Sequence, residues 1–327
     1  MRAIPLLLLL GLVPLVGCSR DPGPTAEAQP PSQLPPGLFL MDLVPETGFG
    51  LYAAGGTSKA TMSGGVFRLS GDRLALLSDD MVFAHNIERF SDGYIATDTD
   101  RPFAAILDRR GVTVRRIERL VWLDGTDEPL LGCNWLKPVA RSEVARFLGV
   151  SPSGRPHLLV CKARPGQGQG MWWALCSLED DTLRSLWEMP AARKAHAALL
   201  HDGVFYGAAS AARTLVVRGR ERELTLPLGD IRYMELGAGR LWMAGDGFVG
   251  VLDQLPPAAD ATARTFCSGI GRAQAVHVWR DRVYVTANGM LLVYDLEGRL
   301  QRTVGQAPPP PGQSWLHDGL RALGYVQ

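Results

Sequence analysis

The chain is poor in lysine and carries little excess of either charge. Its only lysines are Lys59, Lys137, Lys162 and Lys194, and the formal net charge of the 327 residues is +1. Nucleic-acid binding needs basic side chains gathered on one surface, where they neutralise phosphates. The excess of arginine over lysine is typical of a GC-rich genome and marks no site. The composition therefore argues against a nucleic-acid-binding function.

The motifs of several large enzyme classes are also absent. The sequence has no Gly-x-Ser-x-Gly, no Walker A motif and no His-Glu-x-x-His. The glycine-rich segment 166–170 lacks the strand-to-helix context of a phosphate-binding loop. No two cysteines are separated by two residues, which argues against zinc-ribbon and thioredoxin-like sites. We therefore expect a binding role rather than catalysis, and we predict no cofactor.

One long apolar run is present, at the N-terminus. Arg2 precedes it, and it extends from Ile4 to Val16, which is too short to span a bilayer stably and is typical of a cleaved export signal. The four residues Leu15–Cys18 read Leu-Val-Gly-Cys and resemble the lipobox of bacterial lipoproteins. The resemblance implies that residues 1–17 form the signal peptide and that Cys18 carries the lipid, including palmitate. The alternative is an ordinary secretory signal in which this cysteine occurs by chance.

The segment 18–37 is rich in Pro, Ala, Gln and Ser, and we interpret it as an extended tether. Ser19, rather than an aspartate, follows Cys18, which resembles lipoproteins that are sent to the outer membrane. We therefore expect a lipid-anchored protein of the bacterial cell envelope, with the outer membrane favoured over the inner membrane.

From Leu38 the pattern changes to short runs of alternating apolar residues broken by Gly, Asp and Asn, which predicts antiparallel strands. The clearest unit runs from Ala275 to Gly305 and contains four such runs. Asn288 and Gly289 separate the second run from the third, and Asn-Gly favours a tight hairpin because both residues tolerate positive φ. Four antiparallel strands in succession are typical of a β-propeller blade.

Related segments recur through residues 38–305 at intervals of roughly 35 to 45 residues, the range expected for propeller blades. They predict an all-β fold with six four-stranded blades, which begin near Leu38, Met81, Val144, Ala195, Ile231 and Ala275. One interval is too long, and an insertion at about 120–144 accounts for it. In its blade pattern the chain resembles the NHL, YVTN and SMP-30-like propellers, and this resemblance implies a fold but no activity. Seven blades, or two β-sandwiches, are the alternatives, and we expect a monomer.

The C-terminal part, residues 306–327, begins with the stiff segment Pro308–Pro311. Ser314 could then cap a short helix that gathers its apolar residues on one side. We expect this helix to dock on the propeller, and the alternative is a peptide that binds a partner.

Three histidines lie in predicted first strands, which line the axis of a propeller: His85, His196 and His277. Three imidazoles on one axis could hold a divalent metal. However, when strand positions are counted back from the turn that follows each strand, the positions of His85 and His196 differ by one residue, and His277 lies two residues further along its strand. Because a one-residue shift reverses the direction of a strand side chain, we prefer to interpret them as ordinary surface or channel histidines.

Two other groups could form binding sites. Asp98 and Asp100 could supply oxygens to a calcium ion, although aspartate is also common in loops. Trp172, Trp173 and Trp187 could offer a stacking platform for a sugar. Adjacent strand residues point to opposite faces, so packing between blades should account for at least one of these rings.

Besides Cys18 there are four cysteines, which permit two disulfides in an exported protein. Cys161 and Cys176 flank segment 166–170 almost symmetrically, and a symmetric hairpin would place them opposite each other. Cys133 would then be left for Cys267, which would pin the insertion to the fifth blade. The alternative is four reduced, buried thiols.

The sequence as a whole predicts a membrane-anchored envelope lipoprotein whose propeller is a scaffold for protein binding or assembly. One alternative is a propeller hydrolase or lyase that holds a divalent metal in the channel, with ligands among His85, His196, His277, Asp98 and Asp100. Another is a carbohydrate-binding propeller.

Overall fold

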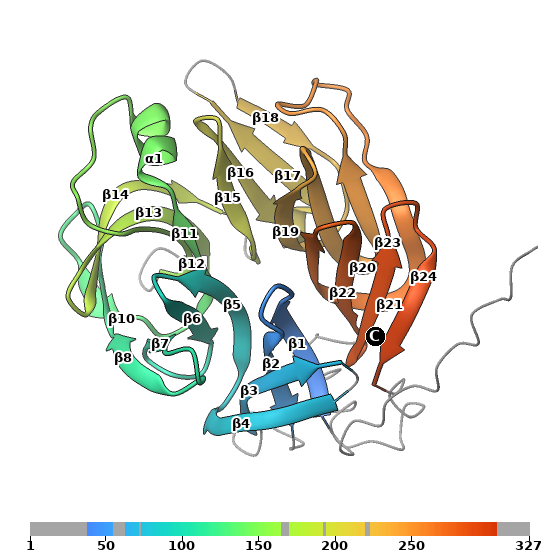
Figure 1. Cartoon of the computed structure of the whole chain (residues 1–327). Helices are drawn as coiled ribbons and strands as arrows, with labels where there is room; N and C mark the ends of the chain where they lie inside the picture. The colour runs from blue at the N-terminus through green and yellow to red at the C-terminus, as the bar shows by residue number, and fades with distance from the viewer. Residues whose placement is uncertain are drawn as a thin grey trace, which may run out of the picture.

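The alternating apolar residues form antiparallel sheets arranged around a common axis in the computed structural model (Figure 1). The structure describes residues 38–54, 63–71, 73–164, 170–191, 194–219 and 223–305. The predicted signal peptide, lipidated cysteine, tether and C-terminal helix lie outside these residues. Within the described part of the chain, no helix has the length and apolar character needed to cross a membrane.

Two four-stranded sheets come first along the chain. The first sheet contains β1 (Leu38–Val44), β2 (Phe49–Ala54), β3 (Ser63–Ser70) and β4 (Arg73–Met81). The second contains β5 (Ala84–Phe90), β6 (Gly93–Asp98), β7 (Ala104–Leu107) and β8 (Thr113–Ile117). In both sheets the strands follow one another in chain order, so each is a simple meander, as expected for propeller blades.

The third sheet has six strands in the order β10-β9-β14-β13-β12-β11. Its strands are β9 (Arg119–Val121), β10 (Asp127–Pro129), β11 (Cys133–Val139), β12 (His157–Ala163), β13 (Met171–Glu179) and β14 (Thr182–Pro190). Much of the segment set aside as an insertion, about 120–144, thus belongs to this sheet. β9 and β10 extend its outer edge, and β11 is its innermost strand. Helix α1 (Arg141–Leu148) follows β11 and ends at Gly149, whose φ of 74° suits a left-handed C-terminal cap.

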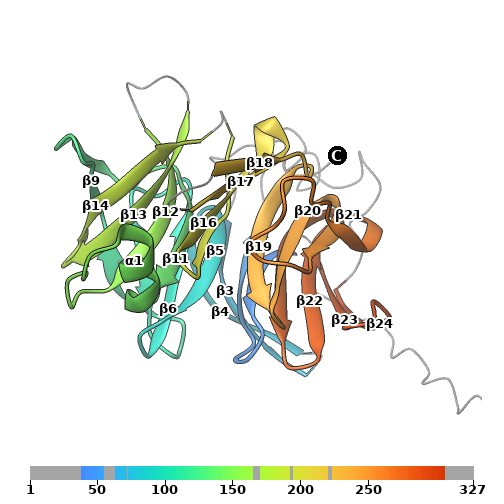
Figure 2. The same cartoon turned by 90° about the horizontal axis from the view of Figure 1, so that it is seen from above.

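The remaining strands form two sheets. The fourth contains β15 (Ala198–His201), β16 (Val204–Ala209), β17 (Thr214–Arg218) and β18 (Glu223–Leu226), with a 3₁₀ turn at Ser210–Ala212. The fifth contains β19 (Ile231–Gly237), β20 (Arg240–Leu252), β21 (Arg264–Trp279), β22 (Arg282–Ala287), β23 (Met290–Asp295) and β24 (Leu300–Val304). Figure 2 shows the sheets from above, with α1 beside the third sheet and away from β22–β24.

The described residues form five blades, so the predicted number of six is wrong. The last two predicted blades, from Ile231 and from Ala275, are joined in one six-stranded sheet by the 16-residue strand β21. Its first half pairs with β20, and its second half pairs with β22. Gly269 and Gly271, both at positive φ (72° and 69°), lie between the two halves, where the strand changes partners. The last sheet therefore presents two strands to the axis, β19 and the second half of β21.

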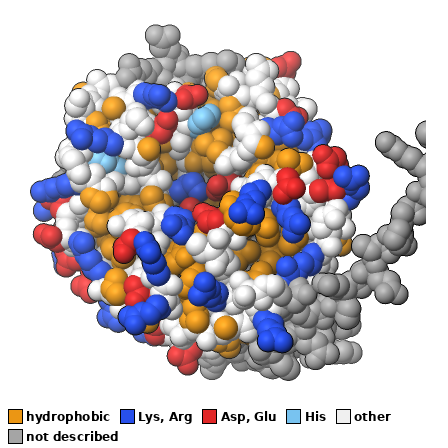
Figure 3. Space-filling view, viewed as in Figure 1, with side chains coloured by type: hydrophobic (Ala, Val, Ile, Leu, Met, Phe, Trp, Pro, Cys, Tyr) orange, Lys and Arg blue, Asp and Glu red, His pale blue; other side chains and the backbone are white. Residues whose placement is uncertain are grey.

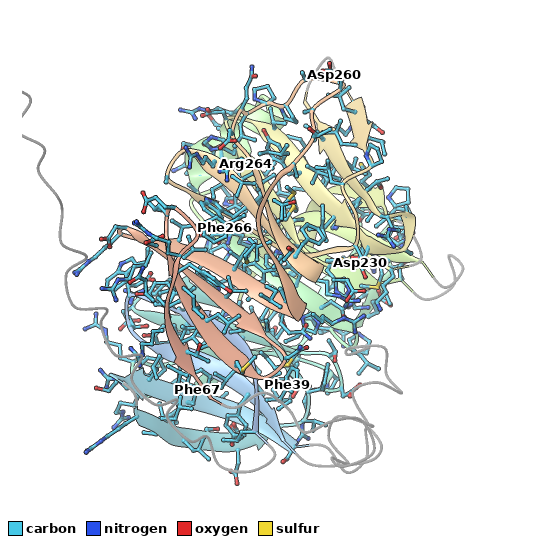
Figure 4. All side chains as sticks on the ribbon, turned by 90° about the vertical axis from the view of Figure 1, so that its right-hand side faces the viewer. Phe39, Phe67, Asp230, Asp260, Arg264 and Phe266 are labelled. Carbon is cyan, nitrogen blue, oxygen red and sulfur yellow. The ribbon has the colours of Figure 1, made fainter. Side chains whose placement is uncertain are left out.

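The ring closes where the first and last sheets meet. Leu40 and Gly289 form an isolated antiparallel bridge, and the Thr286 hydroxyl donates a hydrogen bond of 2.9 Å to the carbonyl oxygen of Met41. Phe39 packs close to Gly289, which leaves no room there for a larger residue. Figure 4 looks onto this side, with Phe39 and Phe67 of the first sheet below the part of β21 that carries Arg264 and Phe266. Packing between sheets, rather than a shared strand, therefore closes the ring.

Large apolar side chains fill the space between the sheets. Trp135, Trp173 and Trp242 are at most 1% exposed, and they belong to one core that extends from the third sheet to the last. Complete burial of a large apolar side chain contributes roughly 1.5–3 kcal/mol relative to exposure. This packing, and not the charged side chains described below, supplies most of the stability of the ring.

The predicted disulfides are wrong, because all four cysteines are free thiols. The hairpin of β12 and β13 pairs Cys161 with Trp173 and Cys176 with Leu158, so its register is not symmetric about segment 166–170. The two thiols consequently face opposite sides of the sheet and belong to different cores. Cys133 shares a core with Cys176, whereas Cys267 is half-buried on β21 beside Val249, in the last sheet.

Candidate functional site

Charged side chains gather at the two ends of the propeller axis. The group at one end is called here the Lys137 cluster and consists of Asp42, Glu88, Lys137, Tyr233, Glu235 and His277. The group at the opposite end is called the Arg232 cluster and consists of His85, Lys194, His196, Asp230, Arg232, Asp246 and Arg272. Each cluster draws its residues from the innermost strands of several sheets or from the loops next to them.

Lys137 links the second sheet to the last across the axis. Its ammonium nitrogen Nζ donates to Glu88 Oε1 at 2.8 Å and to Glu235 Oε2 at 2.9 Å. The Tyr233 hydroxyl also donates to Glu88 Oε1, at 3.4 Å. Trp135 lies beside this group, with its ring centroid 5.8 Å from the Lys137 nitrogen. One lysine therefore ties together strands that are far apart in the sequence.

Asp42 and His277 form the second part of the Lys137 cluster. His277 Nε2 donates to Asp42 Oδ1 at 2.8 Å, and the Asp42 carboxylate is fully buried. The backbone N–H of Leu43 also donates to Oδ1, and that of Ile87 donates to Oδ2, each at 2.8 Å. Both oxygens of this buried carboxylate thus accept hydrogen bonds, which offset the cost of removing its charge from water.

The pKa values within the Lys137 cluster follow from burial and from these contacts. Burial raises the pKa of Glu88, and Lys137 only partly offsets this effect. Burial opposes the charged form of His277, but the hydrogen bond that it donates to Asp42 and the negative charge of Asp42 outweigh this effect, so the pKa of His277 is raised. For Lys137 too, the two carboxylates outweigh burial and raise the pKa. The lysine is therefore charged at neutral pH, and protonation of His277 is favoured.

A small pocket opens at this end of the axis. Its volume is about 140 Å³, and Glu88, Glu235 and His277 contribute to its wall together with Trp279 of β21. Figure 3 shows basic and acidic side chains side by side in a hollow at the centre of this face, with hydrophobic side chains around them. Glu88 and Glu235 already bond to Lys137, and His277 bonds to Asp42, so these three wall residues offer few free polar atoms to a ligand.

The Arg232 cluster lies at the other end of the axis. Asp230, labelled in Figure 4, lies on the side away from the face shown in Figure 1. Arg232 is 3% exposed, and its Nη2 donates to Asp230 Oδ2 at 3.1 Å. Its Nη1 lies 3.3 Å from Nε2 of the buried His196. The imidazoles of His85 and His196 stack with their centroids 5.6 Å apart and their planes 11° from parallel.

The protonation state of His196 follows from its contact with Arg232. A guanidinium group can only donate, so Nε2 of His196 accepts, and the proton of the neutral ring is then on Nδ1. Burial and the charge of Arg232 lower the pKa of His196 well below its usual value. The same two causes, with a contribution from Lys194, lower the pKa of His85 to about 4.

The structure brings two of the three candidate metal-binding histidines together and separates the third. His85 and His196 lie six residues before the positive-φ turn residues Ser91 and Asp202, so they occupy equivalent positions in their sheets. His277 belongs to the other end of the axis. The cations that disfavour a proton on His85 and His196 would also repel a divalent metal ion. Among the described residues, no three His, Cys, Asp or Glu side chains are placed to hold a metal.

Asp98 and Asp100 lie in and just after β6. The Asp98 carboxylate accepts hydrogen bonds from the backbone N–H groups of Val82, Phe83 and Asp100, at 2.6, 3.1 and 3.0 Å. It therefore fixes the chain that connects the first sheet to the second, and its oxygens are occupied by these donors.

Of the three tryptophans considered for sugar binding, Trp187 packs against Phe205, and the other two face opposite sides of β13, as the strand geometry predicts. Trp173 is fully buried against Phe205 in the large core. Trp172 packs at the outer side of the third sheet, where the guanidinium carbon of Arg164 lies 4.7 Å from its ring centroid. Arg164 in turn bonds to Glu188 at 3.0 Å. The ring of Trp172 is therefore part of a packed contact with Arg164.

An apolar surface at the outer edge of the ring was not recognised from the sequence. It is called here the rim patch and consists of Leu76 and Leu77 of β4 with Val112 and Val114 at β8, which are 49%, 39%, 51% and 61% exposed. The strands are adjacent, since Thr113 Oγ1 donates to Asp80 Oδ2 at 3.3 Å. A groove of about 530 Å³ lies at Val112 and Val114, and it is lined by Asp80, by residues 112–116, by Glu118 and by Asp181.

Comparisons with known proteins bear on the fold alone. No protein-family model matches the chain, and no curated protein matches it. Among solved structures, the chain is similar to the AfRom2 CNH domain, with 12% identity, a TM-score of 0.43, and coverage of 83% of this chain and 84% of that chain. It is also similar to a chain of a nidogen/laminin complex, with 10% identity, a TM-score of 0.48, and coverage of 83% of this chain and 93% of that chain. A third similar structure is the WD40 β-propeller domain of Doa1, with 8% identity, a TM-score of 0.48, and coverage of 82% of this chain and 83% of that chain.

Proposed function

We propose that this chain is a lipid-anchored protein of the bacterial cell envelope whose propeller binds another protein through the rim patch. The observation that carries the proposal is the exposure of four aliphatic side chains on or beside the outermost strands of two neighbouring sheets, two of which, Val112 and Val114, line one groove. Single exposed apolar residues are common on protein surfaces, but contiguous apolar patches are typical of interaction sites.

The form of the rim patch indicates what kind of partner it accepts. β8 is the last strand of its sheet, so among the described residues its outer edge has no paired strand. An extended segment of a partner can add to such an edge through backbone hydrogen bonds while its side chains enter the adjacent groove. The groove carries three carboxylates, Asp80, Glu118 and Asp181, against two arginines, Arg115 and Arg116. We therefore infer an extended partner segment with apolar side chains and a net positive charge.

The anchor in this proposal rests on the lipobox at Leu15–Cys18, and Ser19 supports the outer membrane. A lipid on Cys18 would hold the propeller at the membrane surface through the tether, where its rim can meet membrane-bound partners. Replacement Cys18→Ser, followed by fractionation and labelling with radioactive palmitate, tests this part separately. We expect loss of label and release from the membrane fraction. Unchanged membrane association would show that the anchor is wrong.

Site-specific photo-crosslinking in intact cells tests the partner. A photoreactive residue at Val114 or Leu77 should give an adduct of higher mass with a specific envelope protein. The matched control is the same residue at Leu300, which is 54% exposed on β24 of the last sheet. Val114→Asp should abolish the adduct formed from Leu77, because a charge in the patch must be desolvated.

Three outcomes would overturn the partner assignment. Equal adducts from Val114 and Leu300 would indicate non-specific proximity. No adduct from either rim position would show that the patch is not covered by a protein in the envelope. An adduct within the chain itself, to a peptide from residues 306–327, would assign the patch to the C-terminal segment instead.

A further inference from the structure

The Arg232 cluster carries more positive than negative charge in a largely buried place. Its cations are Lys194, Arg232 and Arg272, and its anions are Asp230 and Asp246. Arg232 and Arg272 are 3% and 7% exposed. The two histidines are neutral there, because burial and the neighbouring cations lower their pKa values. Arg232 pairs with Asp230 and Arg272 faces Asp246, so the half-buried Lys194 is the cation in excess within the cluster.

Hydrogen-bonding capacity in the cluster is also unused. Nδ1 of His196 and Nε of Arg232 are buried, and among the described residues no atom accepts a hydrogen bond from either of them. Both side chains are more than nine-tenths buried. Buried donors without a partner are rare in folded proteins and usually indicate an ordered water, an ion or a ligand.

We propose that the Arg232 cluster binds a small anion with a carboxylate or phosphate group at this end of the propeller axis. An anion balances the excess charge and accepts the unused hydrogen bonds at the same time. Water could accept those bonds as well, but it would leave the charge uncompensated. Guanidinium groups suit such an anion because their planar donors match the geometry of carboxylate and phosphate oxygens.

The site can be reached from solvent at its outer side. Lys194, Asp230 and Asp246 are half-buried, in contrast to Arg232 and His196 behind them. Asp230 holds Arg232 in place through Nη2, and Arg272 Nε lies 3.9 Å from Asp246 Oδ1. Lys194 is therefore the cation that an entering anion meets first.

Calorimetric titration of the full chain in non-ionic detergent tests the proposal. Acetate and inorganic phosphate serve as separate probes, with ionic strength held constant by sodium fluoride. We expect saturable binding of at least one probe with one site per chain. Lys194→Gln should weaken it by about tenfold or more, the loss expected for one charge-assisted hydrogen bond. Arg110→Gln, which removes a charge from a side chain that is 83% exposed, should leave the affinity unchanged.

A spectroscopic measurement keeps the test valid if the variant does not fold. In the wild-type protein, saturating probe should shift the imidazole nitrogen resonances of His196 and leave those of the solvent-exposed His201 in place. The absence of saturable binding for both probes at millimolar concentration would overturn the proposal. Equal affinity of Lys194→Gln and wild type, or equal shifts at His196 and His201, would do so as well. Binding of phosphate but not acetate would assign the site to phosphate-bearing ligands, and the reverse to carboxylates.

Discussion

Removal of the lysine that bridges the axis should destabilise the protein strongly and in a pH-dependent way. Lys137→Met keeps most of the aliphatic chain but leaves Glu88 and Glu235 without their shared partner. Lys137 makes two charge-assisted hydrogen bonds, at 2.8 and 2.9 Å. Each such bond contributes about 1.5–3 kcal/mol. The side chains of Lys137, Glu88 and Glu235 are 17%, 15% and 22% exposed. Water can therefore hydrate the two carboxylates in the variant and offset part of the lost hydrogen-bond energy.

The net loss should therefore be about 2–4 kcal/mol, at the lower end of the range for breaking a buried ion pair. In a domain of this size it should lower Tm by on the order of 5–10 °C. Urea unfolding followed by tryptophan fluorescence gives the free energy directly. Arg119→Gln is the control, because it breaks an ion pair with Asp127 that lies in solvent, and its effect should be much smaller.

The pH dependence of this variant checks the cause of the loss. Burial already raises the pKa of Glu88, and removal of Lys137 takes away the charge that opposes this rise. A carboxyl group with a raised folded-state pKa binds its proton more tightly in the folded protein, so stability increases as pH falls through that pKa. The variant should be less destabilised at about pH 5 than at about pH 8. A pH-independent loss, or one no larger than that of Arg119→Gln, would refute this account of the cluster.

Three further predictions follow from other contacts. Because the pKa of His277 is raised in the folded protein, protonation of His277 should stabilise the fold at pH values below the usual histidine pKa, and this stabilisation should be lost as pH rises through the folded-state pKa. Asp42→Asn should remove this pH dependence from the midpoint of urea unfolding. Gly237→Ala should cost about 1–3 kcal/mol, since the added carbon would lie 2.4 Å from Cβ of Val278, whereas Gly154→Ala meets nothing and should be neutral by the same assay. The four cysteines beyond the lipobox should all react with a thiol reagent in denatured, unreduced protein and should react far more slowly in the folded protein; fewer than four would indicate disulfides.

The parts of the fold that local chemistry determines could be predicted from the sequence. Asn288 and Gly289 form the expected tight turn between β22 and β23, with φ of 49° and 79°. Strands begin at Leu38 and Ile231, as the alternating pattern predicts. In these places the residue types and the backbone conformation agree within a few positions, so no long-range information is needed.

Features that depend on long-range pairing could not be predicted in the same way. β21 changes partners at Gly269 and Gly271, and glycine in a strand pattern is equally consistent with a loop between two blades. The register of the β12–β13 hairpin depends on its connecting segment and on packing, which is why Cys161 and Cys176 do not meet. Both errors come from treating neighbouring strands as symmetric units.

Part of the site carries a signal that a closer comparison of the blades would reveal. Glu88, Glu235 and His277 each lie three residues before a turn residue with positive φ. Those turn residues are Ser91, Ala238 and Arg280. Charged or titratable residues at one repeated position of the inner strands indicate a shared location at the axis. Lys137 lacks this signal, because α1 follows β11 in place of a hairpin turn.

The difference between the two ends of the axis indicates where a ligand is expected. A propeller needs no buried charge for its stability, because its sheets pack through apolar side chains and burial of charge is costly. At the Lys137 end, Lys137 bonds to both Glu88 and Glu235, so these charged groups have partners within the cluster. At the Arg232 end, buried donors on Arg232 and His196 have no acceptor among the described residues, and one positive charge is in excess. Packing between the sheets does not account for that excess positive charge, because an apolar residue at the same place would pack better. Binding of a small anionic ligand at the Arg232 end therefore explains the excess charge and the buried donors, which the stability of the fold does not explain.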